Sequence, residues 1–247
     1  MSSHKNNIVA IVQARMGSTR LPGKVLMEIV GKPMLWHIVN RLRYSKLINR
    51  IVVGTSINKK DDLIENFCKE YKIDFYRGSE EDVLDRYYQT AKAFEANIIV
   101  RITADCPLID PEIVDLVIKN HIKTNSDYTS NTIKRTFPRG LDTEVFNFDS
   151  LKRVCHNATE PYQREHVTVY FYENPQLFKV YNVENNIDIS YLRWTVDEDK
   201  DLLFVREIYK RLYSEKDIFL MMDILNILKK EPYLIEINKD VKQKSIR

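Results

Sequence analysis

The chain has 247 residues, enough for one large domain or two small ones. Its 44% hydrophobic and 30% charged residues are typical of a soluble globular protein, and its net charge of +3 is too small to indicate nucleic-acid binding by itself. No apolar run reaches the roughly 18 residues that a membrane span needs. The N-terminal residues MSSHKNN lack the apolar stretch of a signal peptide, so we expect a cytoplasmic protein without a membrane partner.

Strand and helix patterns alternate through the first half of the chain. Short apolar runs predict strands at 8–14, 50–56, 73–78 and 97–105. Amphipathic segments between and after them predict helices at 33–45, 61–71, 81–96 and 111–122. Ser79 stands where an N-cap of the third helix is expected. Repeated strand–helix units favour an α/β fold whose twisted sheet is mostly parallel, with helices on both faces.

The pattern is less regular from about residue 127. Strand-like stretches lie at 127–131, within 134–146, at 178–183 and at 192–196. Helical stretches lie at 149–158, 160–174, 198–213 and 217–230. There is no repeat and no low-complexity linker, so we expect a single domain over 1–247 with a charged, frayed tail at 238–247.

The loop after the first predicted strand has the composition of an anion-binding site. Its sequence, QARMGSTRLPGKVL, places Arg15, Arg20 and Lys24 among glycines and hydroxyl side chains. Backbone N–H groups in such a loop bind anions, arginine grips phosphate in a bidentate manner, and lysine adds a point charge. Val25 follows Lys24, so this is not a Walker loop. A solvated basic turn is the alternative.

Two aspartates stand at the ends of predicted strands. Asp105 ends the strand at 97–105, and Asp197 follows the strand at 192–196. The carboxyl ends of parallel strands meet at one edge, and carboxylate oxygens suit Mg²⁺ bound with polyphosphate. The pair therefore predicts a metal clamp. The alternatives are a loop-capping role for Asp105 and helix capping for Asp197.

The order of several motifs resembles one enzyme family. The chain reads QARMGSTRLPGKVL, RGSEEDVLDRY, RITADCPLIDPE, PRGLDTEVF, REHVT and RWTVDEDKDL. This order resembles the cytidylyltransferases that activate acidic sugars, which include the KDO and acylneuraminate enzymes. It is most similar to the SpsF branch of spore-coat polysaccharide biosynthesis, from about residue 8 to residue 213. Thr195 stands where acylneuraminate enzymes carry a further aspartate, which argues against sialic acid as the acceptor.

The resemblance implies a fold, a reaction and an assembly. The fold would be the GT-A-like, Rossmann-like fold of nucleotidyltransferases. The enzyme would be a transferase that uses CTP and magnesium (Mg²⁺) to activate a sugar acceptor, with pyrophosphate as product. It would act in polysaccharide biosynthesis as a homodimer, with a segment at about 132–180 forming part of the acceptor site and of the dimer contact. No nucleic-acid partner is expected.

The resemblance also implies roles for individual residues. Arg15 and Lys24 would grip the triphosphate as the catalytic pair. Further nucleotide contacts would come from Ala14, Gly17, Ser18, Arg77, Gly78, Ser79, Asp82 and Thr103. The acceptor would lie near Arg139, Gly140, Asp142, Glu144, Glu165 and His166. The metal ligands would be Asp105 and Asp197.

Two other classes of function stay open at the level of sequence. A glycosyltransferase on a related fold would also use a strand-end aspartate and a metal, but the loop with Arg15 and Lys24 suits a free triphosphate better. A non-catalytic nucleotide-binding subunit would keep the fold, although the charged residues of the site are all present. Asp82 as a solvated helix charge and His166 as a structural histidine are the corresponding alternatives for those residues.

Overall fold

A computed structural model describes residues 6–214 and 218–244. Parts of three predictions lie outside these residues. They are the start of the N-terminal stretch without a signal peptide (1–5), the first residue of the helix expected at 217–230, and the end of the charged tail (245–247). Among the described residues, none of the helices combines the length and the apolar character that crossing a membrane requires.

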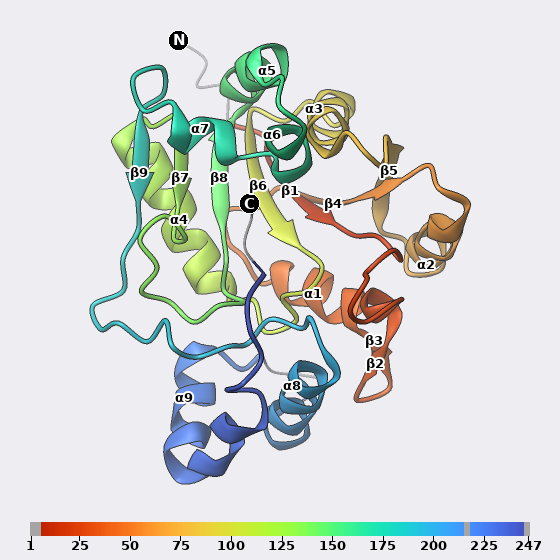
Figure 1. Ribbon diagram of the computed structural model, residues 1–247, viewed down its shortest axis with the longest axis vertical. Helices are drawn as coiled ribbons and strands as arrows, with labels where there is room; N and C mark the ends of the chain where they lie inside the picture. Colours follow the sequence, from red (N-terminus) through yellow and green to blue (C-terminus); the bar gives the residue numbers. More distant parts are fainter. Residues whose placement is uncertain (1–5, 215–217, 245–247) are drawn as a thin grey trace.

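The centre of the protein is a sheet in which seven strands of the described chain pair side by side (Figure 1). Their order is β5 (Asp74–Gly78), β4 (Arg50–Ser56), β1 (Ile8–Gln13), β6 (Ile98–Thr103), β8 (Glu144–Asn147), β7 (Tyr128–Ser130) and β9 (Val180–Asn182). The first four run parallel, β8 is antiparallel to both of its neighbours, and β9 is parallel to β7. The mostly parallel sheet is therefore confirmed.

Helices cover both faces of this sheet, as expected. The helices are α1 (Met34–Leu42), α2 (Asp62–Glu70), α3 (Val83–Ala93), α4 (Pro111–Thr124), α5 (Phe148–Asn157), α6 (Pro161–His166), α7 (Val169–Glu173), α8 (Asp199–Leu212) and α9 (Met221–Lys230). The shorter elements are β2 (Glu28–Ile29), β3 (Lys32–Pro33) and the 3-10 turns η1 (Lys24–Leu26), η2 (Lys59–Asp61) and η3 (Pro232–Ile237).

The residues of β1 show how one strand serves two cores. Ala10 and Val12 pack in a cluster with residues of α1, α4, α8 and α9. Val9 and Ile11 point the other way and pack with residues of α3, α5 and α7. Because successive side chains of a strand alternate between faces, a strand covered on both sides is apolar throughout. This explains the run IVAIV, and it places α8 and α9 on the same core as the sheet.

Two predictions in the helices are wrong. The N-cap of α3 is Asp82, whose Oδ1 accepts from the Asp85 amide at 2.9 Å, whereas Ser79 Oγ accepts from the Asp82 amide one turn earlier. The single helix expected at 160–174 is two helices, α6 and α7, separated by Val167 with φ 63°. The break lets the Thr168 hydroxyl reach Glu144 in β8 at 2.6 Å.

The strand expected at 192–196 is also absent from the sheet. Leu192, Trp194, Thr195 and Val196 are buried, and an isolated bridge joins Arg193 to Arg139. The Trp194 amide donates to the Arg139 carbonyl at 2.6 Å, and the Val196 amide donates to the Asp105 carbonyl at 2.8 Å. The segment is therefore buried against two loops and not against a neighbouring strand of the sheet.

The C-terminal predictions differ from the structure in two places. Helix α9 begins at Met221, because Asp223 Oδ2 accepts from the Leu220 amide at 2.8 Å and ends the non-helical stretch before it. The tail is not frayed where it begins, since Asn238 is buried and its side-chain amide donates to Asp201 and to the Arg193 carbonyl. The single domain, the role of residues 132–180 and the homodimer stay predictions.

Gly140 gives a test of this packing. Its φ is 109°, and a Cβ built on it would lie 2.5 Å from the Trp194 carbonyl carbon. We expect Gly140→Ala to lower the free energy of unfolding by about 2 kcal/mol or more, measured by urea denaturation. Gly17→Ala is the matched control, because its Cβ would meet nothing closer than 3.9 Å. Equal stability of the two variants would contradict the close approach of the two loops.

Candidate active site

The loop after β1 is fixed by backbone contacts at its base. The Met16 amide donates to Asp61 Oδ1 at 2.7 Å, and Asp61 Oδ2 accepts from the Ser56 hydroxyl at 2.5 Å. The loop closes on itself where the Gly23 amide donates to the Met16 carbonyl at 3.1 Å, with Gly23 at φ 72°. Sequence reasoning missed Asp61, which resembles an ordinary residue at a helix start but is buried between two strand ends.

Lys24 brings the two predicted metal ligands together. Its ammonium nitrogen lies 3.0 Å from Asp197 Oδ1 and 3.5 Å from Asp105 Oδ2, and it donates to the Val196 carbonyl at 2.6 Å. The side chain is almost fully buried, so these contacts form in a site with little water. The sequence placed Lys24, Asp105 and Asp197 at one edge of the sheet, and in the structure both carboxylates contact the Lys24 ammonium.

Asp197 has two further cationic partners. Arg20 Nη2 lies 3.0 Å and Arg193 Nη2 lies 2.8 Å from its Oδ2. Burial by itself would raise the pKa of this carboxyl, but Lys24 and Arg20 together lower it below its usual range. Asp197 is therefore ionised at neutral pH. Arg193 was not predicted, since it lies in a segment that reads as a plain strand.

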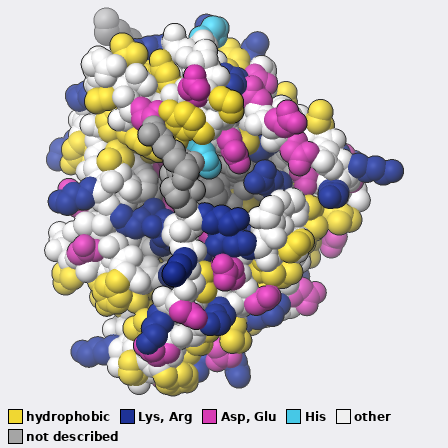
Figure 2. Space-filling model, viewed as in Figure 1, with side chains coloured by type: hydrophobic (Ala, Val, Ile, Leu, Met, Phe, Trp, Pro, Cys, Tyr) yellow, Lys and Arg dark blue, Asp and Glu magenta, His cyan; other side chains and the backbone are white. Residues whose placement is uncertain are grey.

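A cavity of about 620 Å³ opens above these residues. Its walls come from the β1 loop, the end of β6, helix α6, the residues before α8 and the end of the chain. The lining residues are Gln13, Arg15, Ser18, Thr19, Arg20, Lys24, Val25, Thr103, Ala104, Asp105, Glu165, His166, Asp197, Gln243 and Lys244. On the surface, Lys and Arg side chains form a band across the middle of the face shown in Figure 2. The arrangement suits a small, highly charged anion.

Helix α6 forms the wall opposite Lys24 and is tied to α3. Asp82 Oδ2 accepts from Arg164 Nε at 2.8 Å and from Arg164 Nη2 at 2.6 Å. This contact holds the next two residues, Glu165 and His166, over the cavity. Burial lowers the pKa of His166, which keeps the ring neutral at pH 7.

A second cavity of about 190 Å³ adjoins the first and shares Thr103 and His166 with it. Its lining includes four of the residues expected near the acceptor: Arg139, Asp142, Glu144 and His166. Arg101 and Arg135, which were not predicted, also line it. The two cavities together can hold two molecules side by side, with His166 at their border.

The charges of the second cavity are mostly paired. Buried Glu144 accepts from Arg101, and from the Tyr128 and Thr168 hydroxyls at 2.6 Å each. Burial by itself would raise the pKa of Glu144, but the Arg101 guanidinium holds that pKa below its usual value. Asp142 accepts two bonds from Arg135, at 2.5 and 2.8 Å. Arg139 is half-buried, and its guanidinium has no hydrogen-bond or ion-pair partner in the part of the chain that the structure describes.

Six residues that were predicted to contact the nucleotide line neither cavity, and Arg77 is one of them. The Arg77 guanidinium donates to the Ser56 and Asn58 carbonyls, both at 2.9 Å, and to Glu65, which joins β5 to the α2 region. The others are Ala14, Gly17, Gly78, Ser79 and Asp82. Of these, the buried Ala14 donates its amide to the Gly54 carbonyl at 3.1 Å, and Gly78 packs against Arg86. Their roles toward a nucleotide stay predictions.

The metal prediction rests on two carboxylates. Among the described residues, no group of three or more His, Cys, Asp or Glu side chains could enclose a metal ion. Mg²⁺ is commonly bound by one or two carboxylates together with water and substrate phosphates. Asp105 and Asp197, both next to the Lys24 ammonium, match that smaller donor set.

The fold is that of the nucleotidyltransferases. The chain belongs to the cytidylyltransferase family, whose model matches residues 9–244. The family resemblance stated from the motifs is therefore confirmed.

Individual relatives match over almost the whole chain. The spore coat polysaccharide biosynthesis protein SpsF of Bacillus subtilis is 34% identical over 92% of this chain and 96% of its own length. An uncharacterized protein of Methanocaldococcus jannaschii is 41% identical over 97% of this chain and 98% of its own. The structure of a cytidylyltransferase from Leptospira borgpetersenii superposes with a TM-score of 0.89 at 33% identity, covering 97% of this chain and 100% of the other.

The lowered pKa of Asp197 predicts a pH dependence of stability. An aspartate in an unfolded chain has a pKa of about 3.9. Because the folded pKa is lower, the stability that Asp197 contributes is complete above that value and is lost as the pH falls through the folded pKa. We expect Asp197→Asn to lower the free energy of unfolding by about 1–3 kcal/mol at pH 7, and by progressively less below about pH 4.

Urea denaturation at a series of pH values measures this difference. Asp199→Asn is the control, since Asp199 lies two residues further on, exposed in the first turn of α8. A difference between wild type and Asp197→Asn that stays constant down to pH 3 would contradict the ionised, cation-paired carboxylate.

Proposed function

We propose that the protein transfers CMP from CTP to an acidic sugar and releases pyrophosphate. One observation carries this proposal: the Lys24 ammonium between Asp105 and Asp197, at the floor of a large cavity that adjoins a smaller one. The large cavity would hold the triphosphate, and the smaller one the acceptor. Membership of the cytidylyltransferase family supports CTP as the nucleotide.

The residues of the large cavity suit a Mg²⁺–triphosphate. Asp105 and Asp197 would hold the ion, because both carboxylates contact the Lys24 ammonium and line the same cavity. When bound, Mg²⁺ would neutralise charge on the phosphate oxygens. Arg15 is exposed and faces the cavity without a protein acceptor in the described chain, so its guanidinium is available for the phosphates.

The reaction requires positioning and charge stabilisation and no covalent intermediate. An acceptor hydroxyl attacks the α-phosphorus in line, a new O–P bond forms, and the bond to pyrophosphate breaks. Lys24 and Arg15 stabilise the negative charge on the departing pyrophosphate. His166 lies at the border of the two cavities with a neutral ring, so it is placed to accept the proton of the attacking hydroxyl.

The smaller cavity supports an anionic acceptor. Arg101 and Arg135 are paired with Glu144 and Asp142, whereas the Arg139 guanidinium has no such partner among the described residues. A half-buried guanidinium without a carboxylate suits a carboxylate on the ligand. Similarity to a spore coat polysaccharide biosynthesis protein supports a role in building a surface polysaccharide.

Pyrophosphate release tests the proposal directly. The protein is incubated with each of the four nucleoside triphosphates, Mg²⁺ and a panel of sugar acids and sugar phosphates. We expect pyrophosphate from CTP with one sugar acid, and none without Mg²⁺. Release of nucleoside diphosphate from a nucleotide sugar would indicate a glycosyltransferase. Binding of CTP without turnover across the panel would favour a non-catalytic subunit.

Substitution of Lys24 tests its role in the same assay. In Lys24→Ala we expect kcat to fall by about 10²–10³-fold, the usual cost of losing a transition-state charge contact. The fold should survive, because Arg20 and Arg193 still neutralise Asp197. Lys60→Ala removes an equal charge from an exposed position and should leave kcat unchanged. Near-normal turnover in Lys24→Ala would contradict the phosphate-binding role of this loop.

Arg139 tests the acceptor site separately. Arg139→Ala should raise KM for the acceptor by about tenfold or more, because a charge-assisted hydrogen bond is lost, while KM for CTP changes by less than about twofold. Arg139→Lys should recover part of the affinity. Arg43→Ala, at an exposed position after α1, is the control. An unchanged KM for the acceptor would mean that Arg139 does not bind it.

A further inference from the structure

The residues after Asn238, as far as Lys244, return to the large cavity. After η3 the backbone turns at Asn238, whose side chain donates to Asp201 Oδ1 at 2.9 Å and to the Arg193 carbonyl at 3.0 Å. From there the trace runs from the region of α8 and α9 toward the front of the sheet (Figure 1). We call residues Asp240–Lys244 the C-terminal segment.

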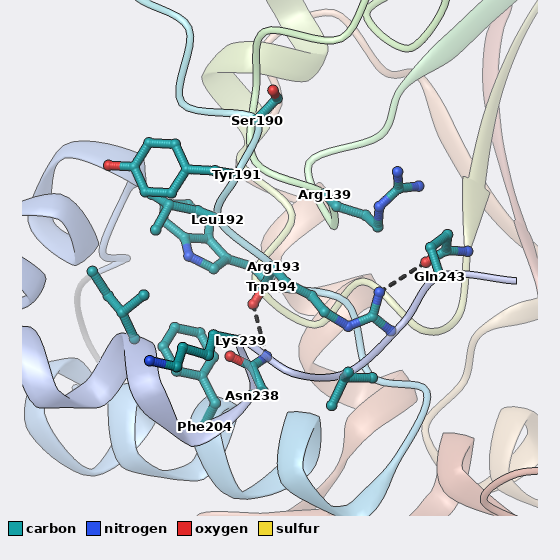
Figure 3. Close-up of a pocket in the computed structure, with 12 residues that line it drawn as sticks. Arg139, Ser190, Tyr191, Leu192, Arg193, Trp194, Phe204, Asn238, Lys239 and Gln243 are labelled. Carbon is teal, nitrogen blue, oxygen red and sulfur yellow. Dashed lines mark hydrogen bonds between the residues drawn. The ribbon is translucent and has the colours of Figure 1, made fainter.

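Contacts on both sides hold the C-terminal segment in place. Asp240 Oδ2 lies 2.5 Å from Lys200 Nζ in α8. The Lys242 carbonyl accepts from Arg20 Nη1 at 3.5 Å, and Gln243 Oε1 accepts from Arg193 Nη1 at 2.8 Å (Figure 3). Arg20 and Arg193 are the two arginines that also bind Asp197. The C-terminal segment therefore contacts both arginines that pair with Asp197, a predicted metal ligand.

The last two residues of the C-terminal segment form part of the cavity wall. Gln243 lines both the large cavity and a small cavity of about 150 Å³ beneath Arg139 and Arg193 (Figure 3). Lys244 lines the large cavity together with the cations of the β1 loop. Its ammonium has no carboxylate partner among the residues that the structure describes.

The charges of the residues that line the large cavity indicate what Lys244 contributes. The cavity lining has four cations, Arg15, Arg20, Lys24 and Lys244, and three carboxylates, Asp105, Glu165 and Asp197. Without Lys244 the formal charges of the lining would balance, and Lys244 and Arg15 are the two cations of the lining that have no carboxylate partner among the described residues. A triphosphate or pyrophosphate needs such an excess of positive charge, because Asp105 and Asp197 already neutralise Lys24 and Arg20.

We propose that the C-terminal segment is a substrate-binding element, in which Lys244 binds the phosphates of the nucleotide and Gln243 positions it. This inference rests on the proposed function, since it takes CTP and pyrophosphate as the ligands of the large cavity. Gln243 and Lys244 lie outside the sequence motifs, in a stretch whose charges by themselves predict a solvated tail.

Calorimetric titration of the full chain with CTP–Mg²⁺ and with inorganic pyrophosphate–Mg²⁺ tests the inference. Lys244→Ala should weaken both affinities by about tenfold, Lys244→Glu by more, and Lys244→Arg should keep most of the affinity. In the assay KM for CTP should rise with little change in kcat, as expected for a contact made equally before and during reaction. The melting temperature should not change, because Lys244 is exposed.

Lys239→Ala is the matched control. Its amine is exposed, pairs with Glu236 and does not line the large cavity, so both affinities should equal those of the wild type. Equal affinities of wild type and Lys244→Ala would overturn the inference and leave the proposed function intact. A wild-type protein that binds neither CTP nor pyrophosphate would overturn both.

Discussion

The ion pairs and the hydrogen bond of the Lys24 ammonium are the interactions on which the site depends. The ammonium joins the loop after β1 to the end of β6 through Asp105, and to the residues before α8 through Asp197 and the Val196 carbonyl. Without this cation Asp105 would lose its ion-pair partner in the described chain, and Asp197 would be paired with Arg20 and Arg193 alone. The same interactions explain why the segment before α8 packs against loops and does not join the sheet.

Charge pairing separates the structural residues of the site from those that face ligands. Glu144 with Arg101, and Asp142 with Arg135, satisfy each other inside the smaller cavity and hold β6, β8 and the preceding loop together. The cations of the cavity walls that have no acceptor in the described chain are exposed or half-buried. Under the proposed function, these unpaired cations are the groups that the anionic substrates would neutralise.

The sequence was sufficient for the fold and for the centre of the site. Strand ends of a parallel sheet share one edge, so the positions of Lys24 and Asp105 followed from the order of the elements. The contacts of Asp61 and Arg193 could not be predicted, because they depend on which loops meet across the edge. The helix break at Val167 was missed for the same reason, since the hydrogen bond that accompanies it joins the Thr168 hydroxyl to the distant Glu144.

The reversed direction of β8 has a consequence for how the two halves of the site are built. Nucleotide-side residues follow the parallel strands β1 and β6, whereas Arg139 and Asp142 precede β8 and reach the same edge because that strand runs the opposite way. The two halves thus occupy separate stretches of the chain. Under the proposed function, exchanges in the loop before β8 would reshape the acceptor cavity while the loop after β1 and the end of β6 stay as they are.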